Sequence, residues 1–354
     1  MTGPHDGWWV LGSALKVVIL FAATLILVMA LVYIERKVVA FMQVRIGPNQ
    51  AGPKGILQTL ADGIKLFFKE PVTPRAVDRP IYILAPLLSL IPMFLVVAII
   101  PFGNSITING REIFLQGTDL NIGILFFLAM SSIGVYGITL AGWASGSKYP
   151  LIGGIRASAQ MISYETCMGL ALIPAVMTTG TLSMRGMVEA QSGTWLGFVP
   201  RWTGLVQVIP MLAFFICAIA ETNRPPFDLV EAETELVGGF HTEYSGIRFA
   251  IFYLAEFANM FTISAIAVTV FLGGWNGPGF SFLPWLWPLL WFFAKTGVLV
   301  FIFMWIRASL PRFRYDQLMS LGWKRLIPVL LVWLLLSSGI QAWINEASNH
   351  VAGG

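Results

Sequence analysis

"GSALKVVILFAATLILVMALVYI", residues 12–34, indicates what kind of fold this chain adopts. The stretch carries a single charged residue, Lys16, and a helix of about 20 apolar residues crosses about 30 Å of hydrocarbon. Seven further apolar stretches have a similar length, and they are residues 81–101, 121–141, 158–179, 204–220, 249–272, 285–306 and 326–345. We therefore predict an all-α, polytopic membrane protein with about eight transmembrane helices, forming a single membrane domain over 1–354.

Composition excludes several kinds of cofactor site. The chain is 56% hydrophobic and 11% charged, which is typical of a core made of helices packed in lipid. Its two cysteines are too few for an iron–sulfur cluster, which needs about four ligands. The three histidines are far apart, and no metal-ligand spacing or phosphate-binding loop is visible. The N-terminus has no basic region ahead of its apolar stretch, so a cleaved signal peptide is not expected.

Basic residues are distributed unevenly between the two sides of the predicted spans. Seventeen Lys and Arg fall in the loops 35–80, 142–157, 221–248 and 307–325, whereas three fall in the loops of the other side. Short cytoplasmic loops carry an excess of Lys and Arg. This asymmetry predicts that the basic side faces the cytoplasm, or the matrix of an organelle, and that both termini lie outside.

The first basic loop, 35–80, contains a turn-rich part and a helical part. Residues 45–55, "RIGPNQAGPKG", are punctuated by Gly and Pro. Residues 55–70, "GILQTLADGIKLFFKE", place apolar side chains at helical spacing, with Asp62 and Lys65 on the opposite side. Two interpretations of this amphipathic helix remain open. It lies flat on the membrane surface, or it covers a cavity with Asp62 and Lys65 turned toward a polar ligand.

The loop 221–248 is unusually acidic for its side of the membrane. Its stretch 224–244, "RPPFDLVEAETELVGGFHTEY", holds five carboxylates in 21 residues. Glu231 and Glu235 share a face of a helix, whereas an extended segment also brings Glu233 to that face. A solvated acidic loop is one interpretation, but the interspersed Phe, Leu and Val residues disfavour a simple tether. In either conformation, these carboxylates are close enough to titrate together.

Besides Lys16, four ionisable residues fall inside or at the end of predicted spans: Glu165, Glu221, Glu256 and Lys295. A charge in hydrocarbon costs about 2.5 kcal/mol or more, so such residues usually face a cavity or a partner. One interpretation is a structural ion pair between Lys295 and one of the glutamates. Because acids outnumber buried cations, the remaining acids must be hydrated or protonated, which is the property that a proton relay needs.

Four stretches carry a resemblance to a known family. They are residues 35–70, 142–165 ("GWASGSKYPLIGGIRASAQMISYE"), 221–246 ("ETNRPPFDLVEAETELVGGFHTEYSG") and 307–324 ("RASLPRFRYDQLMSLGWK"). They closely resemble the quinone-site membrane subunit of respiratory complex I, the proton-translocating NADH:quinone oxidoreductase. The resemblance runs from about residue 15 to residue 340.

The resemblance implies a subunit that binds no cofactor itself and forms much of a quinone-access chamber, with quinone as the substrate. Electrons would arrive from FMN and iron–sulfur clusters in partner subunits. The implied partners are soluble iron–sulfur and quinone-site subunits on the cytoplasmic side, small membrane subunits at the sides, and lipid, with no nucleic acid. The implied location is the bacterial cytoplasmic membrane, ahead of the mitochondrial inner membrane.

The resemblance also assigns residue roles by motif. Its carboxylate chain, which leads from the chamber into the membrane, falls on Glu165, Glu221, Glu231, Glu233, Glu235 and Glu256. Its chamber lining falls on Arg36, Arg45, Asp62, Arg224 and Phe227. One departure is that Ser132 stands where some family members have a carboxylate. A proton route through the third span would then need Tyr136 and water.

Three other functions stay open from the sequence. The same signature occurs in related membrane-bound hydrogenase and photosynthetic quinone-reductase complexes, so it does not name the electron donor. A secondary transporter would also use buried acids, but it predicts inverted repeats that are not visible here. A purely structural anchor for soluble subunits predicts that the intramembrane glutamates are replaceable without loss of function.

Overall fold

A computed structural model gives the fold of the chain. The residues that it describes are 7–108, 111–195, 197, 199–229, 237–279 and 283–352. Seven of the helices in these ranges are long and apolar enough to cross a membrane. They are α1 (Gly7–Met42), α3 (Arg79–Ile99), α4 (Gly123–Ala144), α5 (Lys148–Thr179), α10 (Ile247–Phe271), α11 (Leu286–Ser309) and the helix that continues from α12 (Tyr315–Leu321) into α13 (Ile327–Ala352). The prediction of an all-α, polytopic membrane protein is confirmed.

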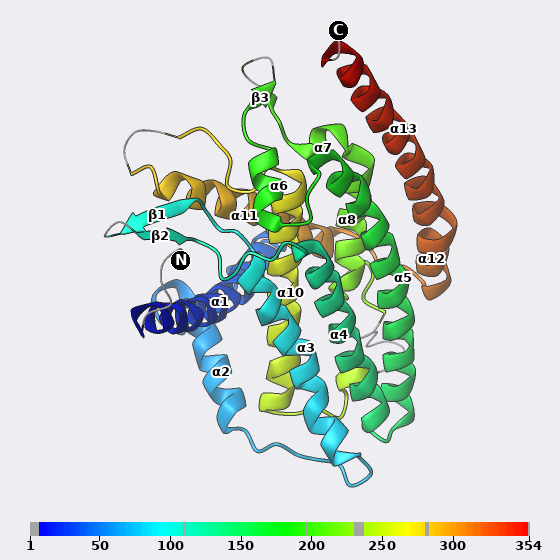
Figure 1. Cartoon of the computed structure of the whole chain (residues 1–354). Helices are drawn as coiled ribbons and strands as arrows, with labels where there is room; N and C mark the ends of the chain where they lie inside the picture. Colours follow the sequence, from blue (N-terminus) through cyan, green and yellow to red (C-terminus); the bar gives the residue numbers. More distant parts are fainter. Residues whose placement is uncertain are drawn as a thin grey trace.

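The bundle is built around α10. This helix passes between α3, α8 (Val208–Glu221) and α11, and 83% of its most apolar window is buried inside the protein (Figure 1). By contrast, only 6% of the corresponding window of α13 is buried, and α13 stands at the outer edge beside α5 (Figure 1). A helix that is apolar on all sides is buried by protein or by lipid. The protein buries α10, whereas most of α13 is left for a membrane or a partner.

The fifth predicted span, 204–220, does not form a helix long enough to cross a membrane. The structure divides it into α7 (Thr203–Val206) and the 14-residue α8, with a break at Gln207, whose φ is −105° and ψ is 51°. Pro210 lies in the first turn of α8, where a missing backbone N–H removes no intrahelical hydrogen bond. The Gln207 side chain is held there by Thr178 and Trp333. Helix α8 ends at Glu221, which is buried inside the protein.

The fourth predicted span begins ten residues too late. Helix α5 starts at Lys148 and not at residue 158, so the predicted loop 142–157 shrinks to a short connection. The sequence near its start is polar and contains glycines, which obscures the helix. Glycines allow α4 and α5 to pack closely here, because a Cβ on Gly142 of α4 would lie 2.9 Å from the Cα of Gly154 in α5. Pairs of small residues bring membrane helices into close contact in this way.

The predicted loop 35–80 is shorter in the structure, because α1 continues to Met42, but its turn-rich part and its amphipathic helix are both present. A turn with positive φ at Gly47, Gly52 and Gly55 leads into a 3₁₀ turn, Pro53–Gly55, and then into α2 (Gln58–Phe68). A Cβ on Gly55 would lie 2.3 Å from the Pro48 carbonyl oxygen, so only glycine fits there. The apolar side chains of α2 are exposed, as in a helix that lies at a membrane surface or beneath a partner.

The opposite end of the bundle carries small elements that the helical pattern did not predict. These are the hairpin β1 (Ser105–Ile108) with β2 (Arg111–Phe114), the short helix α6 (Met184–Ala190), and the hairpin β3 (Thr194–Trp195) with β4 (Val199–Pro200). Ser183 caps α6 by accepting a hydrogen bond from the Gly186 N–H. Figure 1 shows these elements at one end of the molecule, with α2 and the loop before α3 toward the other.

Candidate functional site

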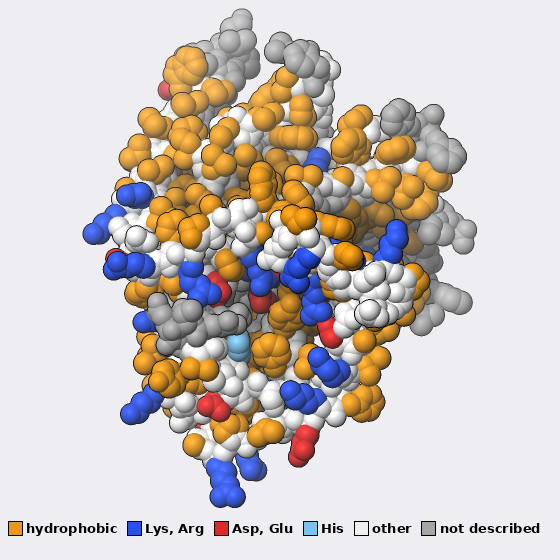
Figure 2. Space-filling view, turned by 180° about the vertical axis from the view of Figure 1, so that it is seen from behind, with side chains coloured by type: hydrophobic (Ala, Val, Ile, Leu, Met, Phe, Trp, Pro, Cys, Tyr) orange, Lys and Arg blue, Asp and Glu red, His pale blue; other side chains and the backbone are white. Residues whose placement is uncertain are grey.

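A polar cavity of about 630 Å³ opens beside the end of α1. It is bounded by α1, the turn before α2, α10 and the end of α11. Its charged and polar lining residues are Glu35, Arg36, Gln43, Arg45, Tyr253 and Arg307. Three guanidinium groups face one carboxylate in this lining, so the cavity favours an electron-rich or anionic ligand. Figure 2 shows that Lys and Arg side chains are spread over the middle and lower part of one face of the molecule.

Asp62 joins the amphipathic helix α2 to α1. Its Oδ2 accepts a hydrogen bond from Arg36 Nη1 at 2.6 Å, Gln58 donates to its Oδ1 at 3.1 Å, and Lys65 Nζ lies 3.8 Å away. Partial burial raises the pKa of Asp62, but the hydrogen bonds from Arg36 and Gln58 and the nearby positive charges lower it more. The pKa of this carboxyl therefore lies below its ordinary value, and Asp62 stays ionised beside the cavity.

Arg224 lies behind the cavity and connects two helices. It is 1% exposed, and its guanidinium pairs with Glu35 on α1 and with Glu256 on α10, where the Nε to Oε1 distance is 2.9 Å. The guanidinium carbon also lies 4.3 Å from the centre of the Phe257 ring. Burial lowers the pKa of Arg224, but the charges of Glu256 and Glu35 raise it more. Arg224 is therefore a fixed buried cation between two carboxylates.

Glu35 also pairs with Arg307 of α11, so it is shared by two arginines. Arg307 is partly exposed and lines the cavity, whereas Arg224 is buried behind it. Glu35 therefore links the cavity-lining Arg307 to the buried Arg224, which in turn pairs with Glu256.

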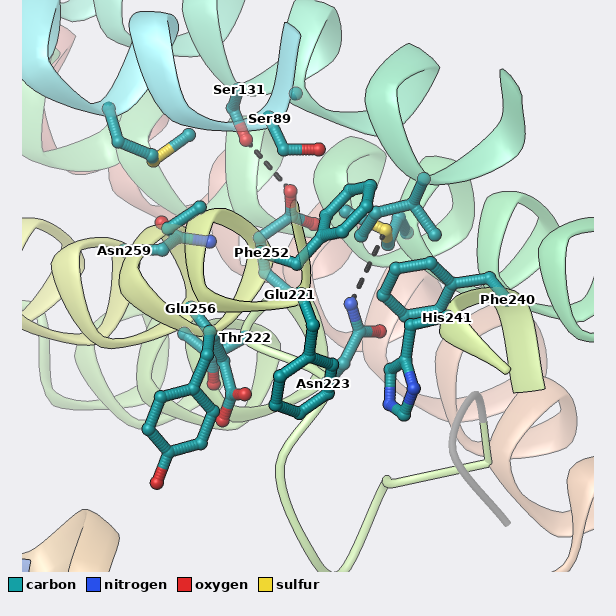
Figure 3. Close-up of a pocket in the computed structure, with 17 residues that line it drawn as sticks. Ser89, Ser131, Glu221, Thr222, Asn223, Phe240, His241, Phe252, Glu256 and Asn259 are labelled. Carbon is teal, nitrogen blue, oxygen red and sulfur yellow. Dashed lines mark hydrogen bonds between the residues drawn. The ribbon is translucent and has the colours of Figure 1, made fainter. Parts of the chain in front are cut away.

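A second, smaller cavity of about 60 Å³ lies beyond Glu256 (Figure 3). Glu221 and Glu256 both line it, together with Asn223, His241 and Tyr253. A buried water needs about 10–15 Å³ and polar partners, so this mostly apolar space has room for several waters beside the Glu221 and Glu256 carboxylates. Tyr253 lines both cavities. The two carboxylates are thus connected through a space that fits a short chain of water molecules.

Two consecutive serines of α4 each hold a different glutamate. The Ser131 hydroxyl donates to Glu221 Oε1 at 2.8 Å, as Figure 3 shows, and the Ser132 hydroxyl donates to Glu165 Oε1. Glu221 is 2% exposed, and its Oε2 has no hydrogen-bond partner within the described ranges. Ser132, which the resemblance singled out as a departure, therefore contacts Glu165 directly. Tyr136 is 62% exposed and does not line the cavity between Glu221 and Glu256.

The ion pair suggested for Lys295 is wrong. Its Nζ donates to the backbone carbonyls of Leu272, Gly274 and Asn276 at 2.8, 3.0 and 2.6 Å, and no salt bridge joins it to a carboxylate of the described chain. These carbonyls follow the C-terminal end of α10, where a cation is favoured by the helix dipole. Lys295 therefore holds the chain as it leaves α10.

Most of the predicted site residues lie at or near one of the two cavities, but some lie at a different place from the one predicted. Arg36 and Arg45 line the large cavity, and Asp62 is bonded to Arg36. Arg224 and Phe227, predicted to line the chamber, are buried behind it in this chain. Glu221 and Glu256 line the small cavity, and Glu165 is held by the next serine along α4. Glu231, Glu233 and Glu235 lie in 230–236, outside the described residues.

Sequence reasoning missed two central residues, Glu35 and Arg307. "ERK" at 35–37 has the pattern of charges that anchor a helix end at the membrane surface, and this pattern hides a buried carboxylate. The ion pair between Asp228 and Arg312, at 2.6 Å, was also not predicted. The signal in the sequence for these pairs is the concentration of arginines in 307–314, which is predicted to lie on the same side of the membrane as the acidic loop 221–248.

Comparison with known families gives one match over most of the chain. The sequence profile of the family described as NADH dehydrogenase matches residues 15–338. This range includes both cavities, the buried pairs of Arg224 and the serines of α4. The chain therefore belongs to the NADH dehydrogenase family, as a membrane subunit of the complex I type.

Proposed function

We propose that this chain forms the quinone-access chamber of a proton-translocating NADH:quinone oxidoreductase and couples quinone reduction to proton movement. The observation that supports this most strongly is the unbroken series from one cavity to the next. The large cavity touches Glu35, Glu35 pairs with Arg224, Arg224 pairs with Glu256, and Glu256 shares the small cavity with Glu221. A pure anchor for other subunits has no need of such a series.

The large cavity suits the polar head of a quinone. Arg36, Arg45 and Arg307 present N–H donors to carbonyl oxygens, while the exposed apolar faces of α1 and α2 suit the isoprenoid tail. In this proposal quinone enters between α1 and α2 and takes two electrons and two protons to become quinol. A partner subunit supplies the electrons from its iron–sulfur cluster.

Coupling follows from the shared position of Glu35. Negative charge developing on the reduced quinone attracts Arg307 into the cavity and weakens its pairing with Glu35. Glu35 then pairs with Arg224 alone, and Arg224 moves toward Glu35 and away from Glu256. A partly buried carboxylate that loses its counter-charge takes up a proton more readily, here from water in the small cavity. Reduction is thereby converted into protonation of Glu256.

From Glu256 the proposed proton route leads inward through the small cavity. Water in the small cavity would connect Glu256 to Glu221, and the serines of α4 place Glu165 next to Glu221. The acidic loop with Glu231, Glu233 and Glu235 is proposed as the cytoplasmic floor of the chamber. The soluble partners would dock on the side of α2, in a bacterial cytoplasmic membrane with both termini outside.

The test replaces Glu256 with Gln in the assembled complex. Inside-out membrane vesicles carrying Glu256→Gln should show quinone reduction and proton uptake reduced by about tenfold or more, with normal amounts of assembled complex. Glu346→Gln is the matched control, because Glu346 is exposed on α13. Wild-type reduction and pumping in Glu256→Gln would overturn the relay, since the amide cannot carry a proton in this way.

A further inference from the structure

A third cavity, of about 560 Å³, lies away from the proposed quinone and proton site. It is a groove between α1 and α3, and the chain after β2 and the start of α6 close its far end. Its size falls in the range of about 300–1,000 Å³ that is usual for small-molecule sites. None of the residues that line it also lines either of the other two cavities.

One part of the groove is apolar and open to the surroundings. Val17 and Phe21 of α1 and Leu95 of α3 line it and are largely exposed. The rings of Phe21 and Phe94 lie 4.8 Å apart, so the two helices meet through this aromatic pair. In a bilayer these side chains would contact acyl chains.

The other part of the groove carries positive charge. Lys16 lies in the apolar first span and makes no hydrogen bond or ion pair with any residue that the structure describes. Arg185 of α6 uses its Nε on Glu189 at 2.6 Å and lies over the Phe114 ring, which leaves further guanidinium donors available. Asp119, the acid in the lining, already accepts a hydrogen bond from Ser183 at 2.8 Å.

We propose that this groove binds an anionic phospholipid, with its phosphate on Lys16 and Arg185 and its acyl chains along Phe21, Phe94 and Leu95. A lone lysine in a membrane span is costly unless a partner is present, and a lipid phosphate supplies that partner. Charge complementarity favours an anionic headgroup over a neutral one. The apolar wall favours a lipid over a free anion, because a free anion would leave that wall unused.

The experiment uses the whole complex, stripped of lipid and reconstituted in phosphatidylcholine nanodiscs that contain a photoactivatable phosphatidylglycerol. After illumination, labelled peptides are located by mass spectrometry. Peptides spanning 13–24 and 94–98 should be labelled in the wild type and about five-fold less in Lys16→Met, since one basic residue near a lipid surface contributes about 1 kcal/mol. Lys16→Arg should retain the label, and the matched control Lys324→Met, at a distant exposed site, should be unchanged.

Four outcomes would overturn the proposal. The first is equal labelling of the wild type and Lys16→Met, and the second is equal labelling by a photoactivatable phosphatidylcholine. The third is loss of the label in excess inorganic phosphate, which would indicate a site for a free anion. The fourth is a set of crosslinks from the groove to a neighbouring subunit in place of lipid. The proposal does not rest on the quinone function, so either can fail alone.

Discussion

At the scale of single residues, the centre of this protein is a buried arginine between two glutamates. Arg224 touches Glu35, Glu256 and the Phe257 ring, so three parts of the chain far apart in sequence meet at one guanidinium. Charges buried in this way are stable only while each has its partner. Glu35 and Glu256 can therefore be accommodated in this apolar chain because Arg224 and Arg307 lie within reach of them.

Replacing Arg224 with Met should destabilise the subunit strongly. The change leaves the carboxylates of Glu35 and Glu256 without their buried cation, and breaking a buried pair in this way costs about 3–5 kcal/mol. We expect a lower thermal unfolding temperature of the purified complex and less assembled complex in membranes. The control is Arg201→Met, because Arg201 is exposed on the other end of the bundle. An Arg224→Met complex as stable as this control would contradict the structural role of the cluster.

At the scale of elements, α2 depends on a few polar contacts for its position. Its apolar side chains are exposed, and in the described chain the ion pair that joins it to another helix is that of Asp62 with Arg36, since Lys65 pairs with Asp62 within α2. The side chains of Arg36 and Asp62 are 40% and 23% exposed, so solvent screening limits the pair to about 1 kcal/mol or less. Helix α2 is therefore weakly held, and under the proposed function it is suited to move when quinone passes.

Acidification should release α2 from α1. The pKa of Asp62 is lowered in the folded chain, so its contribution is fully present above the ordinary carboxyl pKa of about 4 and is lost as the pH falls through the lower folded value. Hydrogen exchange of residues 58–68 should therefore quicken, beyond the intrinsic pH effect, below about pH 4. In Asp62→Asn this additional dependence should be absent, with exchange already fast at neutral pH. A pH response of α2 that is the same in both proteins would refute the assignment.

At the scale of the whole molecule, the two ends of the bundle differ in charge and in construction. One end carries the basic loops, α2 and the large cavity, and the other carries the hairpins and α6. The excess of Lys and Arg on the first end predicts that it faces the cytoplasm. The proposed lipid groove and the proposed quinone chamber then lie toward opposite leaflets.

Cysteine labelling tests this orientation with little background, because Cys167 and Cys217 are both fully buried. Lys54→Cys, in the turn before α2, should react with an impermeant maleimide only in inside-out vesicles. Asn104→Cys, beside the first hairpin, should react only in intact cells. Both positions are exposed, so each serves as the control for the other. The reverse pattern of labelling would place the basic loops outside and contradict the charge rule.

The sequence alone determined the all-α membrane fold, the amphipathic helix and the family, because these depend on apolar length, on periodicity and on long motifs. It also identified Glu165, Glu221 and Glu256 as unusual, since the cost of a charge in hydrocarbon can be read from position. The tertiary structure decided which charges meet. Glu35 pairs with both Arg224 and Arg307, and Lys295 binds backbone carbonyls and not a glutamate. The consecutive serines of α4 each donate a hydrogen bond to a different glutamate. Such pairings depend on how helices pack and rotate about one another, and local sequence does not encode that geometry.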